Sequence, residues 1–297
     1  MSGPSVDIVV CIHNALDDVT NCLDALDRTR FTGPQPGVIL VDDGSDRPTA
    51  SALRDWAGPR DHVRLERRDS PGGYTVAANT GVAASRADLV VLLNSDTIVP
   101  ARWLDKIVRV FDHSPDIGIV GPLSNAASWQ SVPELAAPTG GWAINDLPEG
   151  ATVDDMDALV ELAARSVPVI PRVPFVNGFC YAIRRAVIDR IGTFDETGFP
   201  RGFGEEDDFT LRAVDAGFGV ALALDTYVFH AKSKSYGSAT RSTLTAAGQE
   251  KLRLKHGAGR LERGSLTMRR NPYLERMRRE VGLLIEARTG TTTPAMA

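Results

Sequence analysis

Leu89-Val90-Val91-Leu92-Leu93-Asn94-Ser95-Asp96-Thr97 is an uninterrupted apolar run that ends in a polar triplet. The apolar part predicts a buried strand of a parallel sheet, because helices cover both faces of such a sheet. Open sheets of this kind bind ligands at the carboxyl ends of their strands. The triplet therefore brings Asp96 to a place where a divalent cation and a nucleotide diphosphate can bind. A simple turn is the alternative, since Asn, Ser and Asp favour turns.

Outward from this run, short apolar segments alternate with helical patterns. We expect strands at 6–12, 38–41, 63–66, 89–93 and 117–120, and helices at 15–28, 49–56, 75–85 and 103–112. This alternation predicts an α/β fold with a mostly parallel central sheet flanked by helices. Beyond a Pro-, Gly- and Ser-rich stretch at 124–150, we expect helices at 153–165, 185–191 and 209–216 and strands at 168–173, 179–183 and 227–230. Residues 242–287 look helical and basic.

Composition narrows the function classes. The 297 residues are 43% hydrophobic and carry a net charge of −5, which favours a globular core and argues against a broadly basic nucleic-acid-binding surface. The three cysteines, Cys11, Cys22 and Cys180, form no CxxC pair, as is typical of a reduced compartment. No stretch reaches the roughly 20 apolar residues of a spanning helix, and no signal peptide is evident. We therefore expect a cytoplasmic protein.

Two further strands end in polar residues at the same edge of the predicted sheet. Cys11-Ile12-His13-Asn14 follows the first strand, and Asp42-Asp43-Gly44-Ser45 follows the second. Asp42 or Asp43 can accept hydrogen bonds from a uracil or thymine imide or from ribose hydroxyls. Helix capping is the alternative, because Asp-Gly-Ser is a common start of a helix, and both roles can hold at once.

A glycine-rich loop precedes the third predicted helix. Ser70-Pro71-Gly72-Gly73 permits close approach of the backbone to a ligand, and Asn79 is expected to face the nucleotide edge. The loop lacks the GxGxxG and GxxxxGK[ST] spacings. Dinucleotide binding and P-loop chemistry are therefore disfavoured.

Four consecutive acids follow a glycine in Gly204-Glu205-Glu206-Asp207-Asp208. The helix macrodipole accounts for one or two acids at a helix start. Because neighbouring like charges raise one another's pKa, at least one of these carboxylates is poised to take a proton near neutral pH. An attacking alcohol requires such a general base.

A third cluster, His230-Ala231-Lys232-Ser233-Lys234-Ser235, ends an apolar strand. A histidine at such a position is more often structural than a ligand. The two ammonium groups and the hydroxyls that follow make a plausible diphosphate clamp, and His230 is a candidate metal ligand that complements Asp96.

Together these segments resemble the inverting glycosyltransferases of family 2, which have a GT-A (nucleotide-diphospho-sugar transferase) fold. The resemblance covers most of residues 6–237. It rests on 6–14, 38–45, Asn79-Thr80-Gly81, Asn94-Ser95-Asp96 at the family's D-x-D site, Gly178-Phe179-Cys180 with Ile183-Arg184-Arg185 on the acceptor side, and the acidic motif at 204–212. Within the family, the triplet and the acidic string look most like bacterial rhamnosyltransferase-type enzymes of polysaccharide or glycolipid assembly.

The resemblance implies transfer of a sugar from a UDP- or dTDP-sugar, with dTDP-rhamnose as one candidate, to a hydroxyl of a glycan, a lipid-linked glycan or a small molecule. Asp96 and His230 would bind Mg²⁺ or Mn²⁺, although Asn94 replaces the usual first Asp and supplies no charge. Glu206 is the expected base, with Asp208 and Glu205 as further catalytic candidates. Expected contacts to the nucleotide sugar are Cys11, Ile12, His13, Asn14, Asp42, Asp43, Gly73, Asn79, Asn94, Ser95, Asp96, Lys232, Lys234 and Ser235. Expected acceptor contacts are Asn177, Gly178, Phe179, Phe203, Gly204 and Trp129.

We expect a catalytic domain at 1–240, with a nucleotide-sugar half at 1–121 and an acceptor and catalytic half at 122–240. A basic helical extension at 241–288 and a disordered tail at 289–297 would follow. The extension can pack on the catalytic domain, form a homodimer, or contact the inner face of a membrane peripherally.

Two rival functions remain. A sugar-1-phosphate nucleotidyltransferase would want a glycine-rich basic signature after the first strand, which is absent; a non-catalytic nucleotide-sugar-binding module draws support from Asn94.

Overall fold

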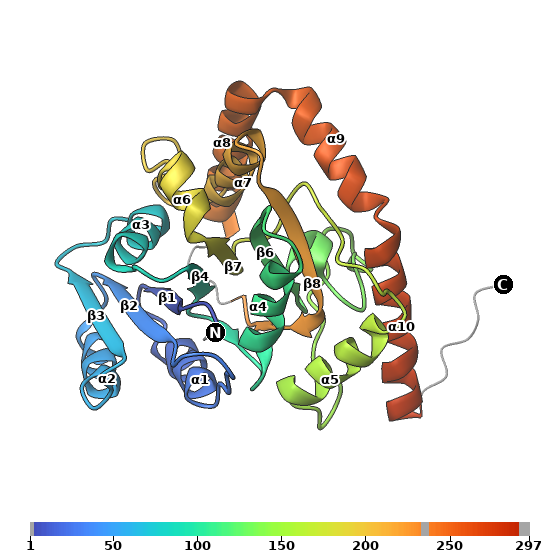
Figure 1. Cartoon of the computed structure of the whole chain (residues 1–297), viewed down its shortest axis with the longest axis horizontal. Helices are drawn as coiled ribbons and strands as arrows, with labels where there is room; N and C mark the ends of the chain where they lie inside the picture. Colours follow the sequence, from blue (N-terminus) through green and yellow to red (C-terminus); the bar gives the residue numbers. More distant parts are fainter. Residues whose placement is uncertain (1–2, 233–237, 291–297) are drawn as a thin grey trace.

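A computed structural model describes residues 3–232 and 238–290 (Figure 1). Within these residues, seven strands form one central sheet in the order β3-β2-β1-β4-β7-β6-β8, and β5 and β9 form a separate pair. The strands are β1 Val6–Ile12, β2 Gly37–Asp43, β3 Val63–Arg68, β4 Leu89–Asn94, β5 Thr97–Ile98, β6 Ile117–Leu123, β7 Cys180–Arg184, β8 Gly219–Tyr227 and β9 Phe229–His230.

The sheet is mostly parallel, as predicted. Strands β3, β2, β1 and β4 run parallel to one another, and β8 runs parallel to β6. Strand β7 is antiparallel to both of its neighbours, β4 and β6. Because β7 runs in the opposite direction, it begins at the edge of the sheet where β4 ends. The segment before β7 is thereby delivered to the carboxyl edge.

Helices cover both faces of the sheet (Figure 1). Apolar residues of α1 (Leu16–Asp27), α2 (Arg47–Ala57) and α4 (Trp103–His113) share one buried cluster with the strands. Residues of α3 (Tyr74–Ala84), α6 (Arg185–Ile191) and α7 (Glu205–Asp215) belong to the cluster on the other face. Helix α5 (Val153–Ala164) packs against β8.

The predicted basic extension forms helices α8 (Ser238–His256), α9 (Ala258–Arg269) and α10 (Pro272–Thr289). Leu274, Met277 and Val281 of α10 are fully buried in the same apolar cluster as α3 and α7. Helix α10 also packs against α5. The extension therefore packs on the sheet domain and contributes to its core.

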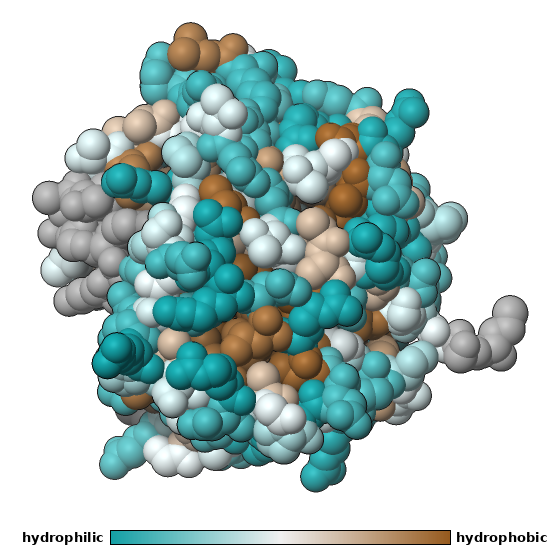
Figure 2. Space-filling model, turned by 90° about the vertical axis from the view of Figure 1, so that its left-hand side faces the viewer, coloured by the Kyte–Doolittle hydropathy of each residue, from teal (hydrophilic) through white to brown (hydrophobic). Residues whose placement is uncertain are grey.

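One face of the molecule is mostly covered by hydrophilic side chains (Figure 2). Figure 2 shows a largely hydrophilic face on which hydrophobic side chains gather only in limited areas. In the part of the chain that the structure describes, none of the helices combines the length and apolarity needed to cross a bilayer.

Three predicted elements differ from the structure. Helix α7 begins at Glu205 rather than at 209, because Gly204 adopts a φ of 132° and acts as its N-cap. The four acids therefore occupy the first turn, where the macrodipole favours them. The strand predicted at 168–173 is absent among the described residues apart from an isolated bridge between Arg172 and Ala221. The strand predicted at 227–230 is instead the end of β8 and the short β9, and β8 was missed because the alanines at 221 and 223 also suit a helix.

We expect Gly81→Ala to destabilise the fold. A Cβ at Gly81 would lie 2.1 Å from Cγ1 of Val9, which is completely buried in β1. Overpacking of this kind costs about 1–3 kcal/mol of folding stability. Alanine gains about 1 kcal/mol over glycine in helix propensity, which does not offset the cost of so short a contact. Urea unfolding measures the change. In a Val9→Ala background the same substitution should cost less, because the opposing methyl group is gone; equal costs in both backgrounds would contradict this account.

Candidate active site

A cavity of about 1100 Å³ opens at the carboxyl edge of the sheet. The ends of β1, β2 and β4 contribute to its wall, together with the glycine loop before α3 and the first turn of α7. Small-molecule pockets commonly span roughly 300–1,000 Å³, so this volume suits a nucleotide sugar with space for a second substrate.

Most of the predicted site residues line this one cavity. From the predicted donor, acceptor, catalytic and metal sets, these are Cys11, Ile12, His13, Asp43, Gly73, Asn94, Ser95, Asp96, Asn177, Gly178, Phe179, Phe203, Gly204, Glu205, Glu206, His230 and Lys232. Segments more than 200 residues apart in the sequence thus converge on a common space.

The structure does not bring all of the predicted residues to the cavity. Asn14, Asp42, Asn79, Trp129 and Asp208 are outside its lining. Asn79 is buried and donates hydrogen bonds to the Phe194 carbonyl at 2.9 Å and to Glu196 Oε1 at 2.8 Å. It therefore ties α3 to the loop before α7. Lys234 and Ser235 lie outside the described residues, and their roles stay predictions.

The two acids at the end of β2 have different surroundings. Asp42 is buried, accepts a hydrogen bond from the Ser45 backbone and pairs with Arg67. Asp43 lines the cavity and accepts hydrogen bonds from the backbone N–H groups of Gly72 and Gly73, each at 2.8 Å. Asp42 therefore acts in the turn after β2, and the N-cap of α2 is Asp46 rather than either predicted acid, whereas Asp43 holds the glycine loop against the cavity.

The cavity also brings together Asp96 and His230, the two predicted metal ligands. Thr97 in β5 pairs with His230 in β9, and this pairing places Nε2 of His230 3.3 Å from Oδ1 of Asp96. The imidazole is stacked on Phe179, with ring centroids 5.3 Å apart. The His230 side chain is only 9% exposed, so its orientation is fixed by packing.

The surroundings of His230 fit a divalent cation. Its Nδ1 lies 3.2 Å from the Ala126 carbonyl oxygen, which can only accept, so Nδ1 carries the proton. Nε2 then faces the Asp96 carboxylate, and a cation held by both groups would take one lone pair from each. Among residues 3–232 and 238–290 no group of three or more His, Cys, Asp or Glu side chains suits a metal. Oxygen and imidazole ligands completed by substrate phosphates are a donor set suited to Mg²⁺ or Mn²⁺.

Three carboxyl groups in the first turn of α7 face the same cavity from another side. Burial, and then the charge of Glu206, raise the pKa of Glu205 well above its ordinary value. Burial likewise raises the pKa of Glu206, and burial and the Glu206 charge raise the pKa of Asp207. Oε2 of Glu206 is buried and has no hydrogen-bond partner. This atom is therefore able to accept a proton from a hydroxyl group that enters the cavity.

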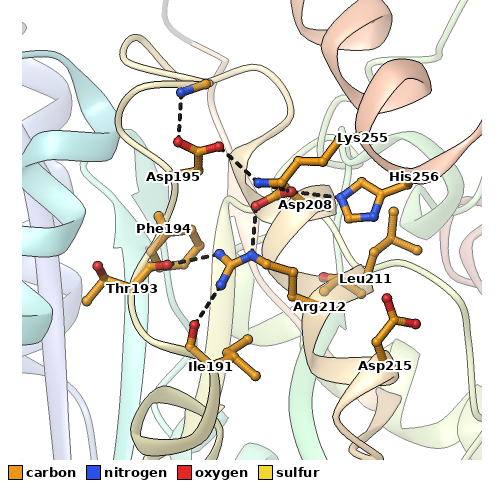
Figure 3. Close-up of polar contacts among 12 residues, drawn as sticks. Ile191, Thr193, Phe194, Asp195, Asp208, Leu211, Arg212, Asp215, Lys255 and His256 are labelled. Carbon is orange, nitrogen blue, oxygen red and sulfur yellow. Dashed lines mark hydrogen bonds and ion pairs between the residues drawn. The ribbon is translucent and has the colours of Figure 1, made fainter.

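Asp208 has a different environment from the other three acids (Figure 3). Its fully buried carboxylate pairs with Arg212 at 2.9 Å, Lys255 at 2.7 Å and His256 at 2.7 Å. Although burial opposes it, these hydrogen bonds hold the pKa of Asp208 below its usual value. A saturated, low-pKa carboxylate is a poor proton acceptor, so Glu206 is the better candidate base.

The cavity is also lined by residues outside the predicted site sets. Trp142 lines it with 44% of its surface exposed, and Trp129 supports it edge to face at 4.6 Å. Thr245, Gln249 and Leu252 of α8 line it as well. Their i, i+4, i+7 spacing marks one helical face, but nothing local in the sequence shows where that face docks.

The chain is similar in sequence and fold to known glycosyltransferases. Residues 7–129 match the family model described as Glycosyl transferase family 2. The pre-mycofactocin glycosyltransferase of Mycobacterium tuberculosis is 28% identical over 225 residues, which are 73% of this chain but 41% of that protein. Glycosyltransferase AglE of Haloferax volcanii is 24% identical over 227 residues, covering 76% of this chain and 67% of AglE.

A solved structure shares the fold. The mannosyltransferase PcManGT from Pyrobaculum calidifontis, in complex with GDP-Man and Mn²⁺, superposes with a TM-score of 0.56 at 17% identity, covering 98% of this chain and 88% of that one. This likeness bears out the predicted GT-A fold. Residues 7–129 of the chain thus resemble glycosyl transferase family 2, and the chain shares its fold with a solved mannosyltransferase.

Proposed function

We propose that the protein transfers a sugar from a nucleotide diphosphate donor, a UDP- or dTDP-sugar, to an acceptor hydroxyl with inversion of configuration. The observation that carries this proposal is the convergence of two groups on one cavity. The Asp96 and His230 pair is suited to a metal and diphosphate, and the unpartnered Glu206 Oε2 is suited to a hydroxyl proton. The acceptor classes that we propose are a glycan, a lipid-linked glycan and a small molecule.

The reaction is a single displacement. Glu206 takes the proton of the acceptor hydroxyl as that oxygen forms a bond to the anomeric carbon. The bond from this carbon to the donor phosphate oxygen breaks, and the nucleotide diphosphate leaves with the bonding electron pair. Since attack and departure occur on opposite faces of the sugar, the configuration inverts. General-base assistance of this kind contributes about 10²–10⁴-fold to the rate.

The burial of the acidic turn supports this assignment. Burial raises the pKa of both Glu205 and Glu206. A carboxylate with a raised pKa takes a proton more readily near neutral pH. Gly178 lies beside the Glu206 side chain, where even an added Cβ would remain at 3.5 Å. The absence of a side chain there leaves room for the acceptor.

The donor would bind on the side of the cavity that carries Asp96 and His230. Asp96 and His230 would hold Mg²⁺ or Mn²⁺, which when bound supplies positive charge to the departing diphosphate. Lys232 lines the same side and carries a further positive charge. Asp43 holds Gly72 and Gly73 so that their backbone lies close to the nucleotide.

We expect Glu206→Gln to lower the rate of nucleotide release by about 10²–10⁴-fold, because an amide cannot accept the hydroxyl proton. Nucleotide affinity should be unchanged. The rate is measured as diphosphate release from UDP-, dTDP- and GDP-sugars with Mn²⁺ and water as the acceptor. The exposed Glu262, on α9, provides the matched control Glu262→Gln. Full turnover by Glu206→Gln would remove Glu206 from the base role.

We expect Asp96→Ala to weaken Mn²⁺-dependent nucleotide binding by about tenfold or more, since loss of even a partner of a metal ligand costs roughly 10–100-fold in affinity. Titration of UDP, dTDP and GDP with and without Mn²⁺ measures the effect. Asp61→Ala, at an exposed position, is the control. Binding that survives in Asp96→Ala with its metal dependence intact would contradict the metal role. Binding without turnover in the wild type would favour a non-catalytic module.

The rate should rise with pH through the titration of Glu206. The base acts only when ionised, and burial raises the pKa of Glu206 above the ordinary 4.5, so the acid limb should lie above that of an exposed glutamate. A pH profile of nucleotide release at saturating donor measures this limb. In Glu206→Gln the limb should disappear from the residual rate; its persistence would assign the limb to another group.

A further inference from the structure

Helix α8 lies directly against the turn that precedes the acidic residues. A Cβ at Gly248 would sit 1.7 Å from the Phe203 carbonyl oxygen, so only glycine allows this close approach. Phe203 and Gly204 both adopt positive φ values, 67° and 132°. Cδ1 of Leu252, one turn further along α8, lies 3.2 Å from the position that a Cβ on Gly204 would take. The strained turn before Glu205 is therefore packed against α8.

The next turn of α8 makes the second contact, with Asp208. Lys255 and His256 both reach Oδ1 of Asp208 at 2.7 Å, and Lys255 also pairs with Asp195 at 2.9 Å (Figure 3). The His256 side chain is 6% exposed, whereas that of Lys255 is 33% exposed. His256 is thus the more deeply fixed of the two partners, and Lys255 links the carboxylate to the loop at Asp195.

These contacts differ in kind from the pair between Asp208 and Arg212. Arg212 lies four residues after Asp208 on the same helix. It also donates to the Ile191 and Thr193 carbonyls, so it ties α7 to the end of α6 and not to α8. Lys255 and His256 come from α8 and fix α7 relative to it. Glu206 lies between the two anchored points, the turn at 203–204 and Asp208. Its position in the cavity therefore depends on α8 from both sides.

We propose that Lys255 and His256 are positioning residues that hold the Glu206 carboxylate in its productive place by anchoring Asp208 to helix α8. The inference rests on the proposed function, in which Glu206 is the base. When Lys255 or His256 is replaced, Arg212 still pairs with Asp208. The fold therefore persists, while the acidic turn is free to shift relative to α8. A displacement of about 1 Å from the reactive geometry can cost on the order of 10²-fold in rate.

The test compares removal with conservative replacement at both positions. Lys255→Met and His256→Phe remove the contacts, whereas Lys255→Arg and His256→Gln keep a donor toward Asp208. We expect the removing variants to lower the rate constant of nucleotide release from the donor panel by about 10–10²-fold at unchanged nucleotide affinity, and the conservative variants to restore much of it. Lys251→Met, at an exposed position on the same helix and outside the cavity lining, should behave as the wild type.

Hydrogen–deuterium exchange gives a readout that needs no turnover. The removing variants should increase exchange of the backbone amides at 202–208, and Lys251→Met should not. Unchanged exchange there, an equal rate loss in Lys251→Met, or a fall in nucleotide affinity that matches the fall in rate would overturn the proposal. A wild type that binds nucleotide without turnover would instead refute the proposed function, while the exchange data would still decide whether α8 orders the acidic turn.

Discussion

The antiparallel pairing of β7 with β4 is the constraint on which the site depends. Leu93 at the end of β4 is paired with Cys180 at the start of β7, and the Asn94 backbone donates to the Phe179 carbonyl at 2.9 Å. A parallel strand at this position would begin at the opposite edge of the sheet. The reversal therefore places the segment before β7 beside the triplet that holds Asp96. It joins the two halves of the cavity through backbone hydrogen bonds, which do not depend on particular side chains.

The acidic turn shows a conflict between stability and chemistry. Glu205, Glu206 and Asp207 are held in a buried turn where each charge is costly, and Glu206 Oε2 has no partner. Asp208, at the fourth position, is fully paired. One saturated carboxylate thus anchors a turn in which one oxygen of Glu206 remains without a partner. Strain of this kind is commonly found where a group must remain reactive.

Sequence reasoning succeeded where a pattern is local. The apolar run at 89–93 predicted β4, and the placement of polar residues after strands predicted several that line the cavity, such as His13, Asp43 and Asp96. Asn14 and Asp42, predicted in the same way, lie outside it. It failed where the result depends on packing between distant segments. Asn79 carries a polar group that suits a ligand as well as it suits the Phe194 backbone, and only the tertiary fold decides between them. The sequence of α8 likewise does not predict where the helix docks. Gly248 only weakens a helix prediction, and its close approach to the Phe203 carbonyl is known only from the structure.

The contribution of α10 to the core also has a consequence for the order of events during synthesis. Met277 and Val281 share a buried cluster with Ala77 of α3 and Phe209 of α7, although they lie more than 65 residues beyond all of these in the chain. Because domains fold as the chain emerges from its N-terminus, the sheet can form early while this part of its core is still exposed to water. The emerging sheet thus presents an apolar surface to chaperones until α10 covers it.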